Sequence, residues 1–117
     1  YEGSITIDRR LLEAADIFIN EQVLVLDIDN GARLVTYAIP GEAGEICVNG
    51  AAARQVNVGD TVIIISYGGL VANEWAGHEP RMVLVNLENS IVGIEGSTSS
   101  KSGAGLAAAH REHHKGD

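Results

Sequence analysis

The sequence has few aromatic and few basic residues. Aromatic residues make up 4% of the 117 residues, which leaves few flat side chains on which nucleic-acid bases could stack. Eight Lys and Arg stand against 16 Asp and Glu, so the formal net charge is -8. Nucleic acids and anionic membranes bind clustered basic side chains, and the composition therefore argues against both as partners.

Cysteine and long apolar runs are also scarce. The single Cys47 cannot form an internal disulfide, which fits a reducing cytoplasm. No apolar run reaches the roughly 18 residues that a membrane-spanning helix needs, and no signal peptide is recognisable. The sequence does not begin with Met, so we expect either a fragment or a chain from which a segment before Tyr1 was removed.

Aliphatic residues, in contrast, are abundant. Hydrophobic residues make up 45% of the chain, mostly Val, Ile, Leu and Ala, and a chain of this length supports one core. Short runs of branched aliphatic residues separated by turn residues predict strands at 4–7, 22–28, 32–39, 45–48, 61–67, 81–87 and 90–94. This pattern predicts a mainly β fold, a closed or nearly closed barrel.

Two local signals refine this prediction. Asp8 is placed to cap a short helix over residues 9–16, whose apolar residues recur at helical spacing. Asn30-Gly31 predicts a tight hairpin turn before the strand at 32–39. Along that strand Arg33 and Tyr37 share one face, and Thr36 lies on the other.

The composition changes after residue 95. Residues 96–105 are rich in Gly and Ser and read as a flexible linker, and 106–115 could form a frayed helix with His110, His113 and His114 on one face. That spacing could hold a metal, but we favour a solvated tail and predict no metal site. We therefore divide the chain into a folded domain at 1–95 and a flexible tail at 96–117.

The Gly3-Ser4 pair at the start of the first strand allows unusual chemistry. The Ser4 hydroxyl can attack the Gly3 carbonyl in an N-to-O acyl shift, and elimination followed by hydrolysis then leaves a pyruvoyl group. Such a carbonyl forms an imine (Schiff base) with an amine substrate. Gly tolerates the strained backbone that this reaction needs. Gly-Ser is also a common cloning remnant, so support must come from the rest of the chain.

Further segments, in order, resemble the pyruvoyl-dependent aspartate 1-decarboxylases, which make β-alanine for pantothenate and coenzyme A. The segments are Gly3-Ser4 after Tyr1, residues 27–34 with Thr36 and Tyr37, residues 49–53, and Gly59-Asp60. The resemblance runs from Tyr1 to about Leu87. It implies a six-stranded double-psi β-barrel with one or two short helices, assembled in the cytoplasm as a homotetramer with active sites between subunits.

The resemblance also implies roles for individual residues. Ser4 would become the pyruvoyl cofactor after cleavage of Gly3-Ser4, Thr36 would polarise the Gly3 carbonyl during self-processing, and Tyr37 would donate a proton after decarboxylation. Arg33 offers a planar fork that can bind a carboxylate of L-aspartate, although a surface arginine after a turn is an equally ordinary interpretation of the residue alone. The remaining substrate-binding residues would be Asn49, Gly50, Ala51 and Ala52.

The chain departs from the family in two places. Family members begin with about twenty further residues, which supply a strand, a lysine and a histidine. Only the last three residues of that segment are present, so we expect it as a separate N-terminal β chain or take the sequence as a fragment. Arg54 stands where the family often has a histidine. The need for a maturation activator as a partner is left open.

Two other classes of function stay open. One is a non-catalytic double-psi barrel that serves as an interaction module, and the presence of Ser4, Arg33, Thr36 and Tyr37 argues against it. The other is a hydrolase that uses Ser4 as an N-terminal nucleophile. A pyruvoyl terminus has no free amine, whereas such a hydrolase keeps one. A measurement of intact mass therefore distinguishes a pyruvoyl enzyme from an N-terminal serine hydrolase.

Overall fold

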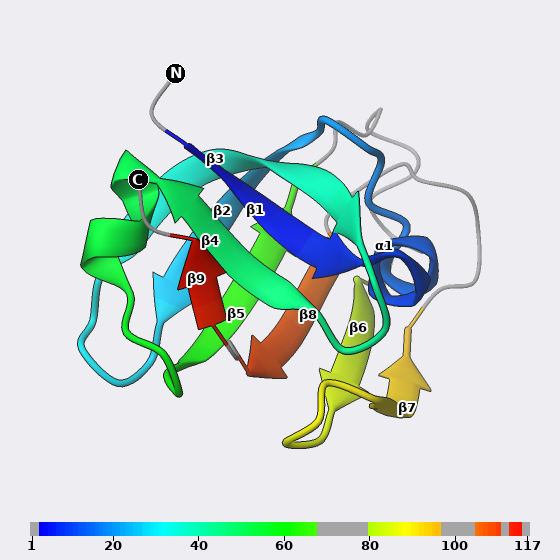
Figure 1. Ribbon diagram of the computed structural model, residues 1–117. Helices are drawn as coiled ribbons and strands as arrows, with labels where there is room; N and C mark the ends of the chain where they lie inside the picture. The colour runs from blue at the N-terminus through cyan, green and yellow to red at the C-terminus, as the bar shows by residue number, and fades with distance from the viewer. Residues whose placement is uncertain (1–2, 68–79, 97–104, 111–112, 116–117) are drawn as a thin grey trace.

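The computed structural model is mainly β with one α-helix, which confirms the predicted fold class (Figure 1). It describes residues 3–67, 80–96, 105–110 and 113–115. The described strands form a nine-stranded sheet in the order β7-β6-β8-β5-β2-β3-β1-β4-β9. The sheet curves around a shared core, which is compatible with a barrel-like fold. Among the described strands, however, the two edge strands do not pair with each other, so the barrel is not closed.

The strands are β1 (Gly3–Asp8), β2 (Gln22–Asp27), β3 (Arg33–Gly41), β4 (Ile46–Gly50), β5 (Thr61–Ser66), β6 (Arg81–Val85), β7 (Ile91–Glu95), β8 (Gly105–His110) and β9 (His113–Lys115). The helices are α1 (Arg9–Ala15) and the 3-10 helix η1 (Ala51–Gln55). No described helix is long and apolar enough to cross a membrane.

The structure differs from the sequence prediction at three places. β3 continues through Gly41, two residues beyond the strand predicted at 32–39, because Pro40 and Gly41 still pair with β1. β4 includes Asn49 and Gly50, two residues beyond the strand predicted at 45–48. Residues 105–110 and 113–115 form strands instead of the helix considered over 106–115: β8 pairs with β5 and β6, and β9 pairs with β4. Tyr1 lies outside the described residues, and the division of the chain after residue 95 stays a prediction.

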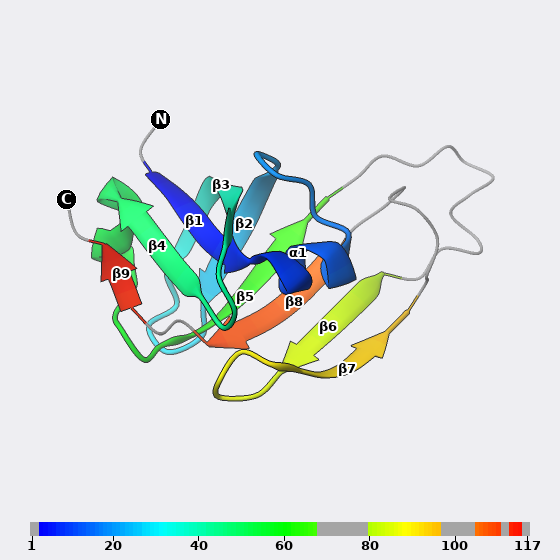
Figure 2. The ribbon, with the colours of Figure 1, turned by 45° about the vertical axis from the view of Figure 1, so that its right-hand side comes forward.

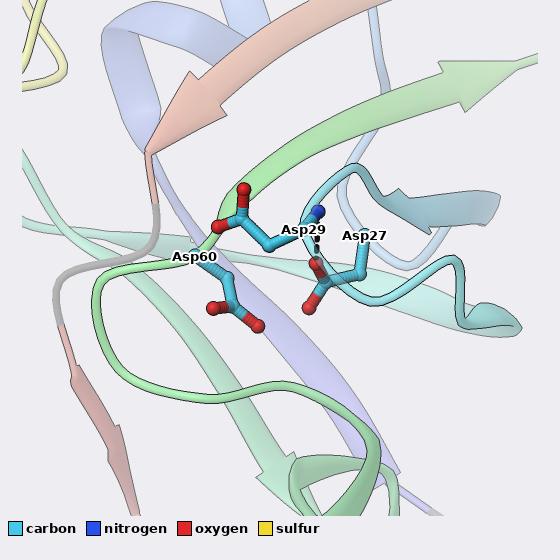
Figure 3. A group of neighbouring side chains, drawn as sticks. All are labelled: Asp27, Asp29 and Asp60. Atoms are coloured by element: carbon cyan, nitrogen blue, oxygen red, sulfur yellow. Dashed lines mark hydrogen bonds between the residues drawn. The ribbon is translucent and has the colours of Figure 1, made fainter.

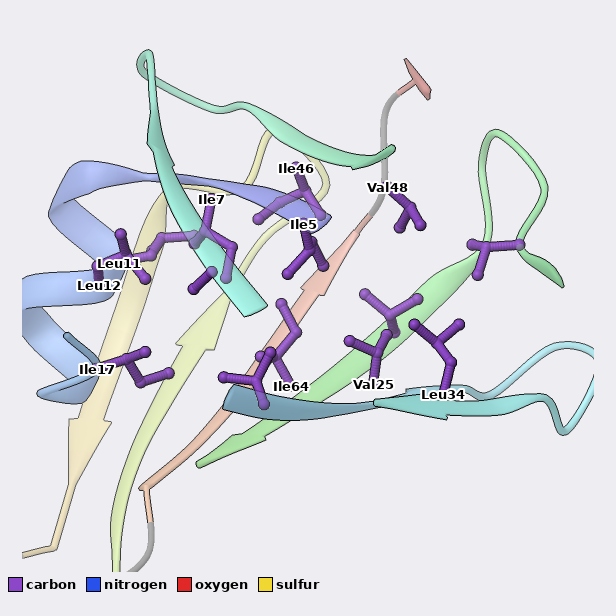
Figure 4. Packing of buried hydrophobic residues seen from close by; sticks show 14 of the residues in the cluster. Ile5, Ile7, Leu11, Leu12, Ile17, Val25, Leu34, Ile46, Val48 and Ile64 are labelled. Atoms are coloured by element: carbon purple, nitrogen blue, oxygen red, sulfur yellow. The ribbon is translucent and has the colours of Figure 1, made fainter. Parts of the chain in front are cut away.

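β1 runs through the centre of this fold. It pairs in parallel with β3 and antiparallel with β4, and all six of its residues are buried. Figure 4 shows its side chains Ile5 and Ile7 packed in an aliphatic cluster with residues from β2, β4, β5 and α1. Burial of each such side chain stabilises the fold by roughly 1.5–3 kcal/mol. The position of Ser4 is therefore fixed by the core of the protein.

The alternation predicted for the other strands is largely present. In β3 Leu34, Thr36 and Ala38 are buried, whereas Arg33 and Val35 are exposed. β5 alternates between buried and half-buried residues. In β3 and β5, one face of the strand thus faces the core and the other faces outward.

Asp8 caps α1 as predicted and also joins two other segments. Its Oδ1 accepts a hydrogen bond from the Arg10 backbone N–H at 2.8 Å, and its Oδ2 accepts one from the Gly44 N–H at 2.8 Å. The cap places α1 at the end of β1, where it packs against β6 and β8 (Figure 2). Burial raises the pKa of Asp8, but the hydrogen bonds from Gly44 and Arg10 outweigh it and hold that pKa below its ordinary value.

We expect Asp8→Ala to destabilise the fold by about 2–4 kcal/mol, since it removes a helix cap and hydrogen bonds to a buried carboxylate. Because the folded pKa of Asp8 is lowered, its stabilisation is present above the unfolded pKa and is lost as the pH falls. Urea unfolding at pH 7 and pH 3 measures both effects. The difference from the wild type should shrink at pH 3, and the exposed Glu42→Ala serves as control. An equal difference at both pH values would contradict this role.

Candidate active site

Gly3 and Ser4 lie where β1 begins, directly opposite the end of β4. The register pairs Gly3 with Gly50 and Ser4 with Asn49. Ser4 is only 3% exposed, although it lies next to the end of its strand. The predicted cleavage bond and the predicted segment at 49–52 are thus brought together by strand pairing.

No side chain fits at position 3. A Cβ built on Gly3 would collide with the carbonyl oxygen of Asn49 and lie 3.1 Å from the Cβ of Ala52. The backbones of β1 and β4–η1 therefore approach each other at the candidate cleavage bond as closely as only glycine permits. This close contact explains why the predicted site has residues as small as Gly3 and Ala52.

The Ser4 hydroxyl is held by Asn49. The side-chain amide of Asn49 donates a hydrogen bond to Ser4 Oγ at 2.9 Å and a second to Thr6 Oγ1 at 3.0 Å. At its other end, Asn49 Oδ1 accepts a hydrogen bond from the Cys47 thiol at 3.3 Å. The amide is therefore oriented from both ends, with its N–H groups toward the serine.

The sequence prediction missed Thr6 and Cys47. Thr6 lies two residues after Ser4, Cys47 lies two residues before Asn49, and the two are paired in the β1–β4 register. Residues two apart in a strand share a face, so strand alternation would have placed both beside the site. The sequence does not show in which register β1 and β4 pair, and that register is what brings Thr6 and Cys47 to Asn49.

Thr36 and Tyr37 lie at the same end of the sheet. β3 runs parallel to β1, and Ala38 of β3 pairs with Ile5 of β1. Thr36 and Tyr37 directly precede Ala38, and Gly3 and Ser4 directly precede Ile5. The two pairs of residues therefore lie at the same end of these neighbouring strands. Thr36 is buried, and its Oγ1 has no hydrogen-bond partner among the described residues. A buried hydroxyl without a partner is costly, which marks Thr36 as a group available to a reacting atom nearby.

Arg33 lies elsewhere on β3. It is exposed at the first residue of the strand and shares the outward face with the half-buried Tyr37, as predicted. Four residues of strand separate the two by about 13 Å. On the same outward face, beside Val35 and Tyr67, is a hollow of about 380 Å³. The structure therefore brings Gly3, Ser4, Asn49 and Ala52 together, but within one chain it does not bring Arg33 to them.

The chain is similar in sequence to a known family of proteins. The family model described as aspartate decarboxylase matches residues 1–92. The chain belongs to the aspartate decarboxylase family. The match contains all the candidate site residues and ends inside β7.

Relatives from three bacterial genera carry the name aspartate 1-decarboxylase. The protein of Listeria monocytogenes serotype 4a is 55% identical over 93 residues, which is 78% of this chain and 73% of the relative. That of Clostridium beijerinckii is 52% identical over 103 residues, 86% of this chain and 83% of the relative. That of Caldicellulosiruptor bescii is 54% identical over 94 residues, which is 79% of this chain and 73% of the relative. Family membership thus rests on most of each sequence.

Proposed function

We propose that this chain is the active-site subunit of an aspartate 1-decarboxylase, which converts L-aspartate to β-alanine and CO2. The observation that carries the proposal is the buried Gly3-Ser4 bond, whose serine hydroxyl is held by Asn49 and whose glycine admits no side chain. Family membership supports the same activity. The product would feed pantothenate and coenzyme A biosynthesis in the cytoplasm.

Maturation begins, in this proposal, with the Ser4 hydroxyl. Its oxygen attacks the Gly3 carbonyl carbon, the Gly3–Ser4 C–N bond breaks, and an ester to the Ser4 side chain forms. Elimination then breaks the Cβ–O bond, which releases the Gly3 carboxylate and leaves dehydroalanine at position 4. Hydrolysis of dehydroalanine releases ammonia and leaves the pyruvoyl group. Close packing of Gly3 against Asn49 and Ala52 holds the carbonyl in place for the first step.

Thr36 is proposed to stabilise the charge that develops on the Gly3 oxygen. Its orphaned, buried hydroxyl and its place at the same end of the parallel strands support this role. A donor already oriented in a buried site lowers the barrier without the cost of reorganising solvent.

Thr36→Val should fold normally but cleave Gly3-Ser4 about 10²- to 10³-fold more slowly, because one oxyanion donor is lost. Gel electrophoresis of the precursor over time measures the rate. Thr61→Val on β5 is the matched control and should process at the wild-type rate. Wild-type kinetics in Thr36→Val would remove Thr36 from the maturation step.

The residues present fit a pyruvoyl group at position 4. When formed, this group supplies a ketone that binds the substrate amine and accepts electrons as CO2 leaves. The Asn49 amide, held by Cys47 and Thr6, would remain as a donor at the same place. The small residues Gly50, Ala51 and Ala52 let backbone N–H groups approach a substrate carboxylate.

Arg33 and Tyr37 are proposed to act across a subunit boundary. Both lie on the outward face of β3, away from the core, so they are placed to meet a neighbouring copy of the chain. Arg33 would bind the side-chain carboxylate of aspartate through two hydrogen bonds, and Tyr37 would supply the proton that replaces CO2. This sharing fits a homotetramer with its own N-terminal β chain as a further partner. The need for a maturation activator is left to experiment.

The activity is tested with purified, matured protein and L-aspartate. We expect one β-alanine and one CO2 for each aspartate consumed, and we expect phenylhydrazine, a carbonyl reagent, to abolish the activity. Activity that resists the reagent would rule out a reactive carbonyl, and hydrolysis of an amide without decarboxylation would favour an N-terminal serine nucleophile instead.

A further inference from the structure

Three carboxylates from two turns meet at one end of the sheet, beside the start of β3 (Figure 3). Asp27 ends β2, Asp29 lies in the turn that follows, and Asp60 directly precedes β5. One oxygen from each lies within 4.8 Å of the other two. Asp27 and Asp60 are buried, and Asp29 is exposed and open to solvent.

One oxygen of Asp27 is left without a partner. Asp27 is 2% exposed, and its Oδ1 accepts hydrogen bonds from the backbone N–H groups of Asp29 at 2.9 Å and Asn30 at 3.2 Å. Its Oδ2 is buried and has no hydrogen-bond partner in the part of the chain that the structure describes. Figure 3 shows this oxygen pointing toward Asp60. An unsatisfied buried carboxylate oxygen that faces another carboxylate calls for a positive ligand.

Backbone amides orient the other two carboxylates. Asp29 Oδ2 accepts a hydrogen bond from the Thr61 N–H at 3.1 Å, and Asp60 Oδ2 accepts one from the Asn57 N–H at 2.9 Å. The three side chains therefore hold their positions through the backbone of the two turns. A ligand that binds them would find the carboxylates already in place.

We propose that Asp27, Asp29 and Asp60 form a binding site for a divalent cation, and that Ca²⁺ fits it best. Ca²⁺ binds oxygen at 2.3–2.6 Å, so two oxygens on one ion lie at most about 4.6–5.2 Å apart. Three oxygens spaced evenly around one such ion lie at most about 4.0–4.5 Å apart. The three carboxylate oxygens lie within 4.8 Å of one another, so a small adjustment of the side chains is enough to bring them onto one ion. Mg²⁺ binds at 2.0–2.1 Å and demands near-ideal octahedral geometry, so the more flexible shell of Ca²⁺ suits three carboxylates that the backbone holds in place.

Several features besides distance favour a hard cation. All three ligands are carboxylate oxygens, which Ca²⁺ prefers, and the exposed side of Asp29 leaves room for water to complete the shell. The chain carries a formal net charge of -8, which attracts cations and repels anions. The bound ion would join the turn between β2 and β3 to the segment before β5. That turn leads into Arg33, the first residue of β3.

Without a cation, the same geometry has another outcome. Burial raises the pKa of Asp27, and the Asp60 carboxyl raises it further, mainly because a hydrogen bond between the two side chains favours the protonated form and to a smaller extent through charge repulsion. A proton shared by Asp27 and Asp60 would then neutralise the pair. The cation site and the shared proton differ in their response to added metal, because a pair of carboxyls that shares a proton does not bind the metal.

The test is a titration of the full chain with CaCl2 at constant ionic strength and pH 7.5. We expect a Kd of about 1 mM or tighter and a rise in Tm of about 5 °C at 10 mM Ca²⁺, with a smaller rise in MgCl2. In ¹⁵N NMR spectra the largest shifts should occur at the amides of Asp29, Asn30, Asn57 and Thr61, whose N–H groups contact the three carboxylates.

Asp27→Asn is the decisive variant, because its amide can keep the bonds to the turn and donate to Asp60 while losing a charged ligand. It should fold and lose the response to Ca²⁺. Asp16→Asn removes a charge after α1 and should respond as the wild type does. An unchanged Tm of the wild type in Ca²⁺, or a full response in Asp27→Asn, would overturn the proposal. The first of these results would instead favour the shared proton.

Discussion

Ser4→Ala is expected to leave the Gly3-Ser4 peptide bond intact and to abolish β-alanine formation. Alanine has no hydroxyl to attack the Gly3 carbonyl, so neither cleavage nor the pyruvoyl group can form. Loss of the Ser4 hydroxyl also frees one N–H of Asn49, which still donates to Thr6 Oγ1, so the fold should persist. Mass spectrometry and an aspartate decarboxylation assay measure the two effects on the same preparation.

Two matched variants show whether the effect belongs to the hydroxyl at this site. Ser90→Ala removes an exposed serine from the segment between β6 and β7 and should mature normally. Ser4→Cys keeps a nucleophile at position 4 and should retain some cleavage. Normal cleavage in Ser4→Ala would contradict the proposed maturation.

Arg33→Ala is expected to abolish most aspartate decarboxylation while Gly3-Ser4 cleavage continues. The guanidinium is proposed to hold the side-chain carboxylate of the substrate, and it lies outward on β3, away from the buried cleavage bond. Removal of one partner of a hydrogen-bonded charge pair costs about 2–5 kcal/mol, which lowers kcat/KM about 30- to 5,000-fold.

The geometry of the Arg33 fork can be tested separately from its charge. Arg33→Lys keeps the charge but cannot make two parallel hydrogen bonds, so its kcat/KM should lie between those of the wild type and Arg33→Ala. Arg9→Ala, an exposed arginine on α1, is the control. Near-normal kinetics in a fully matured Arg33→Ala protein would mean that the carboxylate is bound elsewhere.

Features set by neighbouring residues could be predicted from the sequence. Asp8 caps α1 because its side chain reaches the N–H two residues on, and the residues that decide this are adjacent. The turn at Asn30-Gly31 follows from Gly31, which has a φ of 77°. The facing of Arg33, Thr36 and Tyr37 follows from the two-residue repeat of a strand.

Features set by distant pairing could not be predicted. β8 pairs with β5, about forty residues earlier in the chain, and nothing in the local sequence around Leu106 specifies that partner. Cys47 and Thr6 contact Asn49 only because β1 and β4 pair in one register. The cluster of Asp27 and Asp60 likewise depends on two turns that meet in space.

The measurement that tests the central claim most directly is the chemistry at position 4 of the matured protein. Intact mass together with Edman degradation should show a chain that begins at position 4, has no free amine and gains one hydrazone when treated with phenylhydrazine. Ser4→Ala should show none of these changes. A decarboxylase that is active with a free Ser4 amine, or with the Gly3-Ser4 bond uncut, would contradict the pyruvoyl account.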